Sequence, residues 1–355
     1  MPRPTLATIH CSALAHNLQR VRSLAPNAKV FAVIKANAYG HGFMRVAHAL
    51  QTADGFALLE FDAAIQLREA GFTQEILLLE GCFDLQETVQ CAQYQLTIVV
   101  HNRHQLVWLQ QLPAGAGLKV YLKVNSGMHR LGFAVADVAS VYQSLTTCPA
   151  VSVVNVMTHF ADADGAGITS QLQQFDTAIG GGDVSQSLAN SATIIRYPQA
   201  HRQWVRAGIM LYGSSPIAGV SAAALDLRPA MTLSSEIISV CRVKAGDCVG
   251  YGGTYKVTQP MRLGVVACGY ADGYPRHAPT GTPVRVGDHL THTVGRVSMD
   301  LLSVDLTPWP ELDLGAPVVL WGEGNPIDDV AQAAQTISYE LLCALNHRVA
   351  VRKQE

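Results

Sequence analysis

The sequence predicts an α/β protein in which an N-terminal (β/α)₈ barrel of the TIM type is followed by a mainly β C-terminal domain. Up to about residue 213, short apolar runs alternate with amphipathic stretches of helical length, which indicates a parallel sheet covered on both faces. Beyond residue 225 the chain is rich in Val, Thr, Gly and Pro, which is typical of antiparallel strands and turns. The 355 residues also exceed the roughly 250–300 that one core usually supports. We therefore expect a barrel domain at 1–225 and a β domain at 226–355.

Eight apolar runs of strand length precede residue 213, and they lie at 30–34, 55–59, 76–79, 96–100, 118–124, 151–157, 184–188 and 205–211. Segments between them, such as 61–70 and 103–112, carry apolar residues at helical spacing. Eight strand–helix units are the number in a closed barrel. An open doubly wound sheet is the alternative, but the glycine-rich phosphate turn of that fold does not follow the first strand.

The second domain contains short β-type runs separated by turn signals. The runs lie at 237–243, 263–268, 283–286 and 318–321, with turns at 245–247, 272–273 and 286–288. Helical patterns occur at about 327–334 and 339–345. A mostly antiparallel domain with two helices is expected.

Composition excludes several classes of function. Hydrophobic residues make up 49% of the chain and charged residues 15%, so a large core can form and disorder is excluded. The formal net charge is −2, and neither end carries a charged tail. This balance argues against nucleic acid as a partner.

The sequence also predicts a cytoplasmic protein. The first residues lack the apolar stretch of a signal peptide, and no run reaches the roughly 20 apolar residues of a membrane span. The eight cysteines are scattered and form no C-x-x-C pair, so free thiols in a reducing compartment are expected. The thirteen histidines show no zinc-ligand spacing. His10, His16, His48 and His101 are interpreted as surface or core residues, and no metal site is expected.

The most informative segment is 33–42, Val-Ile-Lys-Ala-Asn-Ala-Tyr-Gly-His-Gly. Lys35 ends a buried apolar strand, and the carboxyl ends of barrel strands line the active site. A lysine amine at such a position can form a Schiff base with a carbonyl group. Taken alone, a lysine at a strand end is more often an ordinary residue with its ammonium group in water.

This segment resembles the pyridoxal-phosphate attachment motif of the alanine racemase family. Eight further segments follow in that family's order, at 123–130, 158–160, 189–192, 205–209, 250–255, 269–274, 295–300 and 337–340. The resemblance therefore extends over nearly the whole chain. It implies pyridoxal 5'-phosphate as cofactor, interconversion of L-alanine and D-alanine, and a head-to-tail homodimer with shared active sites.

The resemblance implies a set of cofactor-binding residues, namely Lys35, Tyr39, His159, Asn190, Ser191, Arg206, Gly208, Ile209 and Tyr339. Ser191, the amides of Gly208 and Ile209 and the two tyrosine hydroxyls are assigned to the phosphate, a placement that barrels often use after strands seven and eight. Ser191 could also be a helix N-cap. Arg206 is assigned to the pyridine nitrogen, to which a guanidinium gives no proton. A structural arginine is the alternative.

The resemblance also implies two catalytic bases on opposite faces of the α-carbon, Lys35 and Tyr251. Tyr251 comes from the partner subunit and is linked through His159 to Arg206; by itself it could be a hairpin aromatic. Arg130 is assigned to the substrate carboxylate. The remaining assignments are Met299 and Asp300 beside the substrate, Lys123 as a carbamylated or unmodified lysine, and Asp164, Tyr270, Arg276 and Arg296 in the entrance corridor. Ser298 departs from family members that have cysteine there.

Three alternative functions differ from this one in the sequence features that they would require. A racemase of the same fold with broader amino-acid specificity is the nearest. A non-catalytic pyridoxal-phosphate carrier would lack the domain at 226–355 that supplies Tyr251. A cofactor-free barrel hydrolase would leave the Lys35 segment unexplained.

Overall fold

Each of the eight apolar runs before residue 213 supplies a strand to one parallel sheet in the computed structural model, which describes residues 3–354. The strands are β2 (Lys29–Val33), β3 (Gly55–Leu58), β4 (Glu75–Leu78), β5 (Thr97–Val100), β6 (Leu118–Asn125), β8 (Val151–Met157), β9 (Gln186–Ser187) and β10 (Trp204–Ala207). Neighbours in this order pair with one another, and β10 pairs with β2 to close the ring. The predicted (β/α)₈ barrel is therefore confirmed. A two-residue strand, β7 (Phe133–Ala134), pairs with β6 beside the ring.

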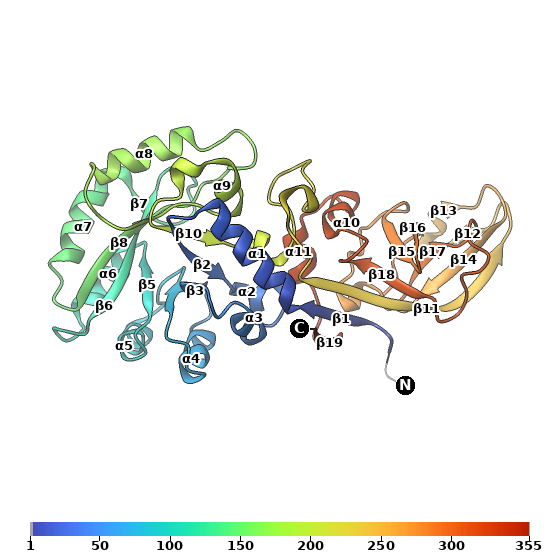
Figure 1. The fold of residues 1–355 in the computed structure, drawn as a ribbon, viewed down its shortest axis with the longest axis horizontal. Helices are drawn as coiled ribbons and strands as arrows, with labels where there is room; N and C mark the ends of the chain where they lie inside the picture. The colour runs from blue at the N-terminus through green and yellow to red at the C-terminus, as the bar shows by residue number, and fades with distance from the viewer. Residues whose placement is uncertain (1–2, 355) are drawn as a thin grey trace.

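Helices surround the barrel strands, as Figure 1 shows. They are α1 (Cys11–Leu24), α3 (Phe43–Ala49), α4 (Phe61–Glu69), α5 (Leu85–Gln93), α6 (Arg103–Gln110), α7 (Val138–Thr146), α8 (Thr169–Ile179) and α9 (Ser191–Arg196). The short segment α2 (Lys35–Tyr39) is a left-handed turn that follows β2. Side-chain caps set where some of them begin: Asp84 accepts from the Glu87 N–H, and Asn102 accepts from the Gln105 N–H. Such caps fix the loops that lead from strand ends into helices.

The eighth predicted strand is too long at its C-terminal end. The run at 205–211 is a strand only to Ala207, and Ile209–Tyr212 forms a 3₁₀ turn, η3. Gly208 lies between them with φ −112° and ψ −105°, a backbone conformation outside the regular strand region. The apolar residues of η3 are buried all the same, which is why the run looks like a strand in the sequence.

Aromatic side chains fill the barrel interior beneath its carboxyl ends. The Phe31 ring stacks on Trp204 at 4.1 Å between centroids and meets Tyr121 edge-on at 6.0 Å. These rings come from β2, β10 and β6, so they join opposite walls of the barrel. The barrel interior is filled with side chains, and any open site lies beyond these rings, at the carboxyl ends of the strands.

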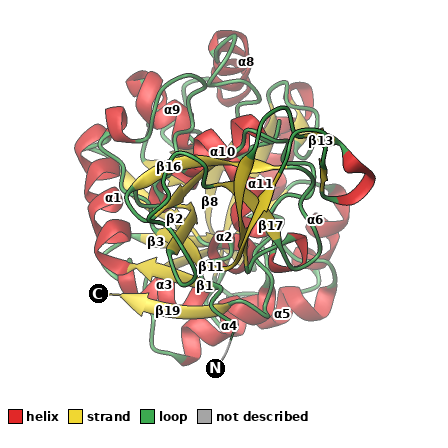
Figure 2. Cartoon of the chain, turned by 90° about the vertical axis from the view of Figure 1, so that its right-hand side faces the viewer, coloured by secondary structure: helices red, strands yellow, loops and turns green. Residues whose placement is uncertain are grey.

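The C-terminal part of the chain forms a mainly antiparallel sheet, which confirms the predicted β domain. Figure 2 views the molecule from this end. Its strands are β11 (Met231–Val243), β14 (Met261–Val266), β15 (Pro283–Val286), β16 (His289–Val294), β17 (Leu302–Asp305) and β18 (Pro317–Trp321), with a separate pair of β12 (Cys248–Val249) and β13 (Tyr255–Lys256). Because β11 pairs with both β14 and β18, six strands close into a ring. The two predicted helices are α10 (Ile327–Ala333) and α11 (Ser338–Cys343).

The N-terminal strand differs from the expected domain division. We expected residues 1–225 to form the barrel domain, but β1 (Leu6–His10) pairs antiparallel with β11 and parallel with β19 (Ala350–Gln354). The first strand therefore belongs to the sheet of the β domain, and the chain enters the barrel domain only at α1. Buried Asn17 on α1 donates to the carbonyls of Leu211 and Arg228 at 2.9 and 2.8 Å, and its side-chain oxygen accepts from the Arg228 N–H. These bonds join α1 to the segment that connects the two domains.

Among residues 3–354, no helix has the length and apolar character that crossing a membrane requires.

Candidate active site

A cavity of about 750 Å³ opens at the carboxyl ends of the barrel strands. Eleven of the residues that the sequence predicts for the site line it: Lys35, Tyr39, Lys123, Arg130, His159, Asn190, Ser191, Arg206, Gly208, Ile209 and Tyr339. All but Tyr339 come from the barrel, and Tyr339 comes from α11 of the same chain. The structure thus gathers residues as far apart in the sequence as Lys35 and Tyr339.

The cavity also contains residues that sequence analysis did not single out. They are Val33, Ala36, Leu59, Leu79, Glu80, Phe83, His101, Leu131, Met157 and Cys343. His101, which we interpreted as a residue outside any site, follows β5 and bonds to the Glu80 carbonyl at 3.0 Å. The rule that strand ends line a barrel site, applied to β4 and β5, would have found Glu80 and His101.

Lys35 stands at the start of a backbone turn with unusual geometry. Ala36, Asn37, Ala38 and Tyr39 have φ between 51° and 54°, which is a left-handed turn that costs about 1–2 kcal/mol per non-glycine residue. Contacts with neighbouring loops hold it: the Ala36 N–H donates to Glu60 Oε1 at 2.9 Å, and Asn37 Oδ1 accepts from the Phe43 N–H at 3.0 Å. Strain of this kind concentrates at functional sites. Lys35 itself is half-buried on the cavity wall.

The β domain packs directly on this turn. Gly40 has φ +78°, and a Cβ there would lie 2.2 Å from the Leu342 carbonyl of α11. This close approach brings Tyr339 toward Tyr39, with ring centroids 6.0 Å apart. Burial raises the pKa of both phenols, that of Tyr339 to about 12. Both hydroxyls therefore remain hydrogen-bond donors at neutral pH.

His41 stabilises the same turn through hydrogen bonds to its backbone. The residue is fully buried, and its Nδ1 lies 2.8 Å from the Tyr39 carbonyl and 3.1 Å from the Ala38 carbonyl. Two carbonyl acceptors require the proton on Nδ1. Burial lowers the pKa of His41 to about 4, so the ring is neutral in the folded protein.

We expect stability to fall as the pH drops below about 6.5. An unfolded His41 takes up a proton near pH 6.5, whereas the folded residue stays neutral down to about pH 4. The unfolded state therefore binds more protons in this window, and His41 alone removes about 3 kcal/mol from the unfolding free energy across it. Urea unfolding between pH 4 and 7 measures the slope. His41→Gln should reduce it, while the same change at exposed His347 should leave it intact; equal slopes in both variants would contradict the assignment.

Hydroxyl and backbone amide groups gather at the carboxyl end of β10. Asn190 caps α9 by accepting from the Thr193 N–H at 3.0 Å. The alternative role of Ser191 as the N-cap of this helix is therefore wrong. The Ser191 hydroxyl instead accepts from the Gly208 N–H at 3.0 Å. A Cβ at Gly208 would lie 2.8 Å from the Tyr39 hydroxyl and 3.8 Å from Ser191 Oγ. Only glycine leaves this space between the hydroxyls open.

Arg206 is buried at the centre of the site. Its Nη1 donates to the carbonyl and hydroxyl of Ser187, both at 2.7 Å, and its Nη2 donates to the Thr158 carbonyl at 2.7 Å. These neutral acceptors hold the guanidinium in place. Burial lowers the pKa of Arg206 to about 10, which still leaves it charged at neutral pH.

The positive charge of Arg206 acts on two neighbours. His159 Nδ1 lies 3.4 Å from Arg206 Nη2, and burial, followed by the charge of Arg206, holds the pKa of His159 well below its ordinary value. His159 is therefore neutral and can accept from the guanidinium. Burial and the charges of Arg206, Arg130 and Lys35 lower the pKa of Lys123 to about 8. A minor fraction of Lys123 is thus an uncharged amine near neutral pH.

The other predicted residues lie away from the cavity. None of six such residues of the β domain lines the cavity of its own chain. Tyr251 and Tyr270 each begin a short 3₁₀ turn, and Arg276, Arg296, Met299 and Asp300 are on loops. Large apolar side chains among them face solvent: 71% of Tyr251 and 53% of Met299 is exposed. Asp164 is exposed on a barrel loop, and its charge contributes to the raised pKa of Tyr339.

The loops that carry these residues pack against one another. A Cβ at Gly250 would lie 3.1 Å from the Arg296 nitrogen, and one at Gly269 would lie 2.4 Å from the Ser298 carbonyl. The Tyr270 N–H donates to the Ser298 carbonyl at 3.1 Å. The turns around residues 250, 270 and 300 therefore form one surface of the β domain.

Comparison with known proteins agrees with this arrangement. The family description "Alanine racemase, N-terminal domain" matches residues 9–216, and "Alanine racemase, C-terminal domain" matches residues 230–353. The chain belongs to the alanine racemase family. It is 54% identical over 353 residues to an alanine racemase of Nitrosospira multiformis, covering 98% of this chain and 99% of the relative. It is 52% identical over 353 residues to a catabolic alanine racemase of Klebsiella aerogenes, covering 99% of each.

Solved structures show the same fold. A biosynthetic alanine racemase from Pseudomonas aeruginosa superimposes with a TM-score of 0.95 at 45% identity, over 99% of this chain and 100% of that one. The alanine racemase from Acinetobacter baumannii gives a TM-score of 0.94 at 39% identity over the same shares. The predictions of family, fold class and alanine racemase activity are therefore confirmed.

Proposed function

We propose that the chain interconverts L-alanine and D-alanine with pyridoxal 5'-phosphate bound through Lys35, in a site that a second copy of the chain completes. One observation carries the proposal: the eleven predicted cavity residues surround one cavity of about 750 Å³, which falls within the usual range for a cofactor-sized ligand. When bound, the cofactor withdraws electrons from the substrate and makes the proton on its α-carbon removable.

The residues at the end of β10 fit a phosphate group. The space in which a Gly208 side chain would lie is bordered by the hydroxyls of Tyr39 and Ser191. The raised pKa values of Tyr39 and Tyr339 keep both phenols protonated and able to donate. Together with the amides of Gly208 and Ile209, these groups would bind the phosphate oxygens. Asn190 would orient Ser191 by capping α9.

Arg206 and His159 would define the electrostatics at the ring nitrogen. The guanidinium is held by neutral acceptors and keeps its protons at neutral pH. It would therefore stabilise an unprotonated ring nitrogen and donate no proton. His159 is neutral and lies 3.4 Å from Arg206. It would link the positive charge of Arg206 to a tyrosine on the far side of the cavity.

Two bases would move the proton. The Lys35 amine, at the cavity wall, would remove or return it on one face of the α-carbon, and the Tyr251 hydroxyl would do so on the other. Arg130 would bind the substrate carboxylate, with Met299 and Asp300 beside it and Asp164, Tyr270, Arg276 and Arg296 lining the approach. Tyr251 lies outside the cavity of its own chain and is 71% exposed, which supports a partner subunit as the source of the second base.

The composition of the β-domain loops supports a dimer. Tyr251, Met299, Tyr270 and Leu301 expose between 37% and 71% of their surfaces. Exposed aromatic and methionine side chains of this kind mark protein–protein interfaces. The scattered positions of the eight cysteines, which form no C-x-x-C pair, support a reducing compartment such as the cytoplasm.

The direct test measures D-alanine formed from L-alanine by the purified protein, before and after removal and return of pyridoxal 5'-phosphate. Activity that depends on the cofactor and stops at an equal mixture of enantiomers is expected. Parallel assays with serine and other neutral amino acids address the alternative of broader specificity, and turnover of serine at a rate equal to that of alanine would favour it.

Lys123 should make the activity depend on carbon dioxide. Only an uncharged amine forms a carbamate, and the pKa of about 8 leaves roughly one Lys123 in ten uncharged at pH 7. The anionic product would offset the charges of Arg206, Arg130 and Lys35. We expect a loss of activity of a few fold in CO₂-free buffer at pH 7, reversed by bicarbonate. Lys123→Gln should not respond to bicarbonate; a response equal to that of the unaltered protein would refute the assignment.

A further inference from the structure

We propose that Arg3 and Arg348 are positioning residues for alanine racemisation that act by orienting Asp300. The inference rests on the proposed function in one respect, the placement of Asp300 beside the substrate. It adds two residues, one near each end of the chain, that line no part of the cavity.

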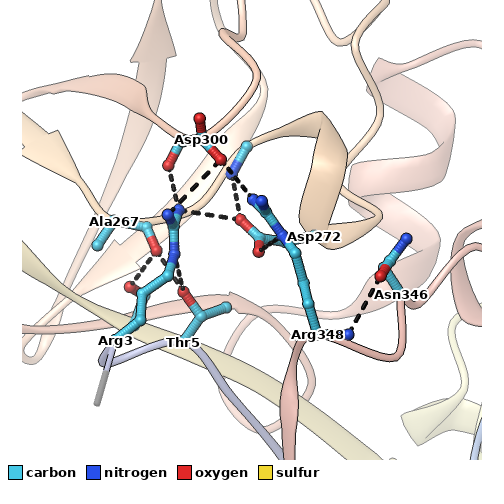
Figure 3. A network of polar contacts seen from close by, with 9 residues as sticks. Arg3, Thr5, Ala267, Asp272, Asp300, Asn346 and Arg348 are labelled. Carbon is cyan, nitrogen blue, oxygen red and sulfur yellow. Dashed lines mark hydrogen bonds and ion pairs between the residues drawn. The ribbon is translucent and has the colours of Figure 1, made fainter.

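The two arginines and two aspartates form one network, shown in Figure 3. Arg348 Nε donates to Asp272 Oδ1 at 2.7 Å, and its Nη2 donates to Asp300 Oδ1 at 2.7 Å. Arg3 Nη2 donates to Asp272 Oδ2 at 3.1 Å and also to the Asp300 carbonyl, while its Nη1 lies 3.7 Å from Asp300 Oδ1. Each guanidinium therefore bridges both aspartates. The bonds to Asp272 and Asp300 raise the pKa of Arg348.

Asp272 is the buried centre of the network, with 1% of its side chain exposed. Besides the two arginines, it accepts from the Gly269 N–H at 2.9 Å. A buried carboxylate is stable only when it is fully paired, so its partners are held firmly. The turn that Asp272 closes is bonded to the Asp300 loop: Tyr270 donates to the Ser298 carbonyl, and Ala271 donates to the Met299 carbonyl at 2.9 Å.

The orientation of Asp300 depends on the arginines because its own surroundings are open. Its side chain is 45% exposed, and the ion-pair partners that the structure gives it are Arg3 and Arg348. A half-exposed aspartate without such partners would sample several rotamers. The two arginines link the Asp300 carboxylate to buried Asp272. They therefore hold this carboxylate in one orientation relative to the core of the β domain.

The fold explains why the two ends of the chain supply these arginines. Arg3 precedes β1 and Arg348 precedes β19, and these strands pair in parallel with Leu6 opposite Ala350. Residues that lead into two adjacent parallel strands emerge at the same edge of the sheet. Here that edge adjoins the loops of Tyr270 and Asp300, so both guanidiniums reach the same pair of carboxylates.

A double-mutant cycle for the Michaelis constant tests the inference in the full holoenzyme. The four proteins are the unaltered chain, Arg3→Gln, Asp300→Asn and the double variant. Arg3→Gln is expected to raise the KM for alanine roughly fivefold, a coupling typical of residues in one network, with a smaller change in kcat. In the Asp300→Asn background the same substitution should leave KM unchanged. Arg3→Lys, which keeps one bridging cation, should restore part of the loss.

A matched control separates positioning from a general effect on the β domain. Arg285 is a half-buried arginine of β15 that pairs with Asp288 at 2.9 Å, away from the Asp300 loop. Arg285→Gln should leave KM unchanged while altering the thermal midpoint by an amount similar to Arg3→Gln. A KM effect of Arg3→Gln that persists undiminished in Asp300→Asn overturns the inference alone. An unchanged KM in Asp300→Asn overturns both the inference and the substrate role of Asp300, and leaves the racemase activity standing.

Discussion

Replacement of Lys35 by alanine is expected to lower racemisation in both directions by more than about a thousandfold, because it removes a catalytic base and the attachment point of the cofactor together. The left-handed turn at residues 36–39 brings Tyr39 and Lys35 to the same cavity. Among residues 3–354, the other lysine that lines the cavity is Lys123, which is on the separate strand β6. Because β6 lies across the ring from β2, we expect that Lys123 does not replace Lys35.

Borohydride reduction followed by peptide mapping gives a readout that does not depend on activity. In the unaltered protein the pyridoxyl group should be found on the peptide containing Lys35, and in Lys35→Ala no labelled lysine should appear. Lys29 is a suitable control because it begins the same strand at the opposite end of the barrel and lies over the Trp204 ring. Lys29→Ala should retain labelling and turnover. Pyridoxyl label on Lys123 of the unaltered protein would show the assignment to be wrong.

The barrel could be predicted from the sequence because each of its strands is marked by the residues of that strand and of the segments next to it. A strand buried on both faces must be apolar throughout, and each of the eight runs is bounded by a helix-length segment. The membership of β1 could not be predicted in this way. Residues 6–10 pair with β11 and with β19, strands more than two hundred positions away. A five-residue run carries no signal of which distant edge it will join.

The site residues that could be predicted are those that lie in recognisable sequence motifs. Lys35, Ser191 and Arg206 lie in segments recognised by resemblance, and the structure gathers them around one cavity. The four consecutive residues with positive φ were not predicted, since Ala and Tyr rarely adopt that region and only contacts such as those of Glu60 and His41 hold them there. The network of Arg3 with Asp272 was missed for a similar reason, because it joins residues 269 positions apart.

Mixing two inactive variants should restore activity if the sites are shared between subunits. Tyr251→Phe removes the second base with little change of shape, so its turnover should fall steeply while the cofactor still binds. In a dimer of Lys35→Ala with Tyr251→Phe, one site would contain both lesions and the other would contain neither. Random pairing makes roughly half of the dimers mixed, so about a quarter of the sites should be intact. Activity measured after subunit exchange should rise to roughly that share.

The control for this experiment is a pair of lesions in the same domain. Lys35 and Arg206 both lie on the barrel, so every site of a mixed dimer of Lys35→Ala with Arg206→Ala would contain one lesion. That mixture should stay inactive. If Tyr251 instead reached the cavity of its own chain, the first mixture would stay inactive as well, although its subunits had exchanged. The exposed position of Tyr251 and its absence from the wall of its own cavity lead us to expect recovery, because a base at this location is better placed to act on a substrate bound by another copy of the chain.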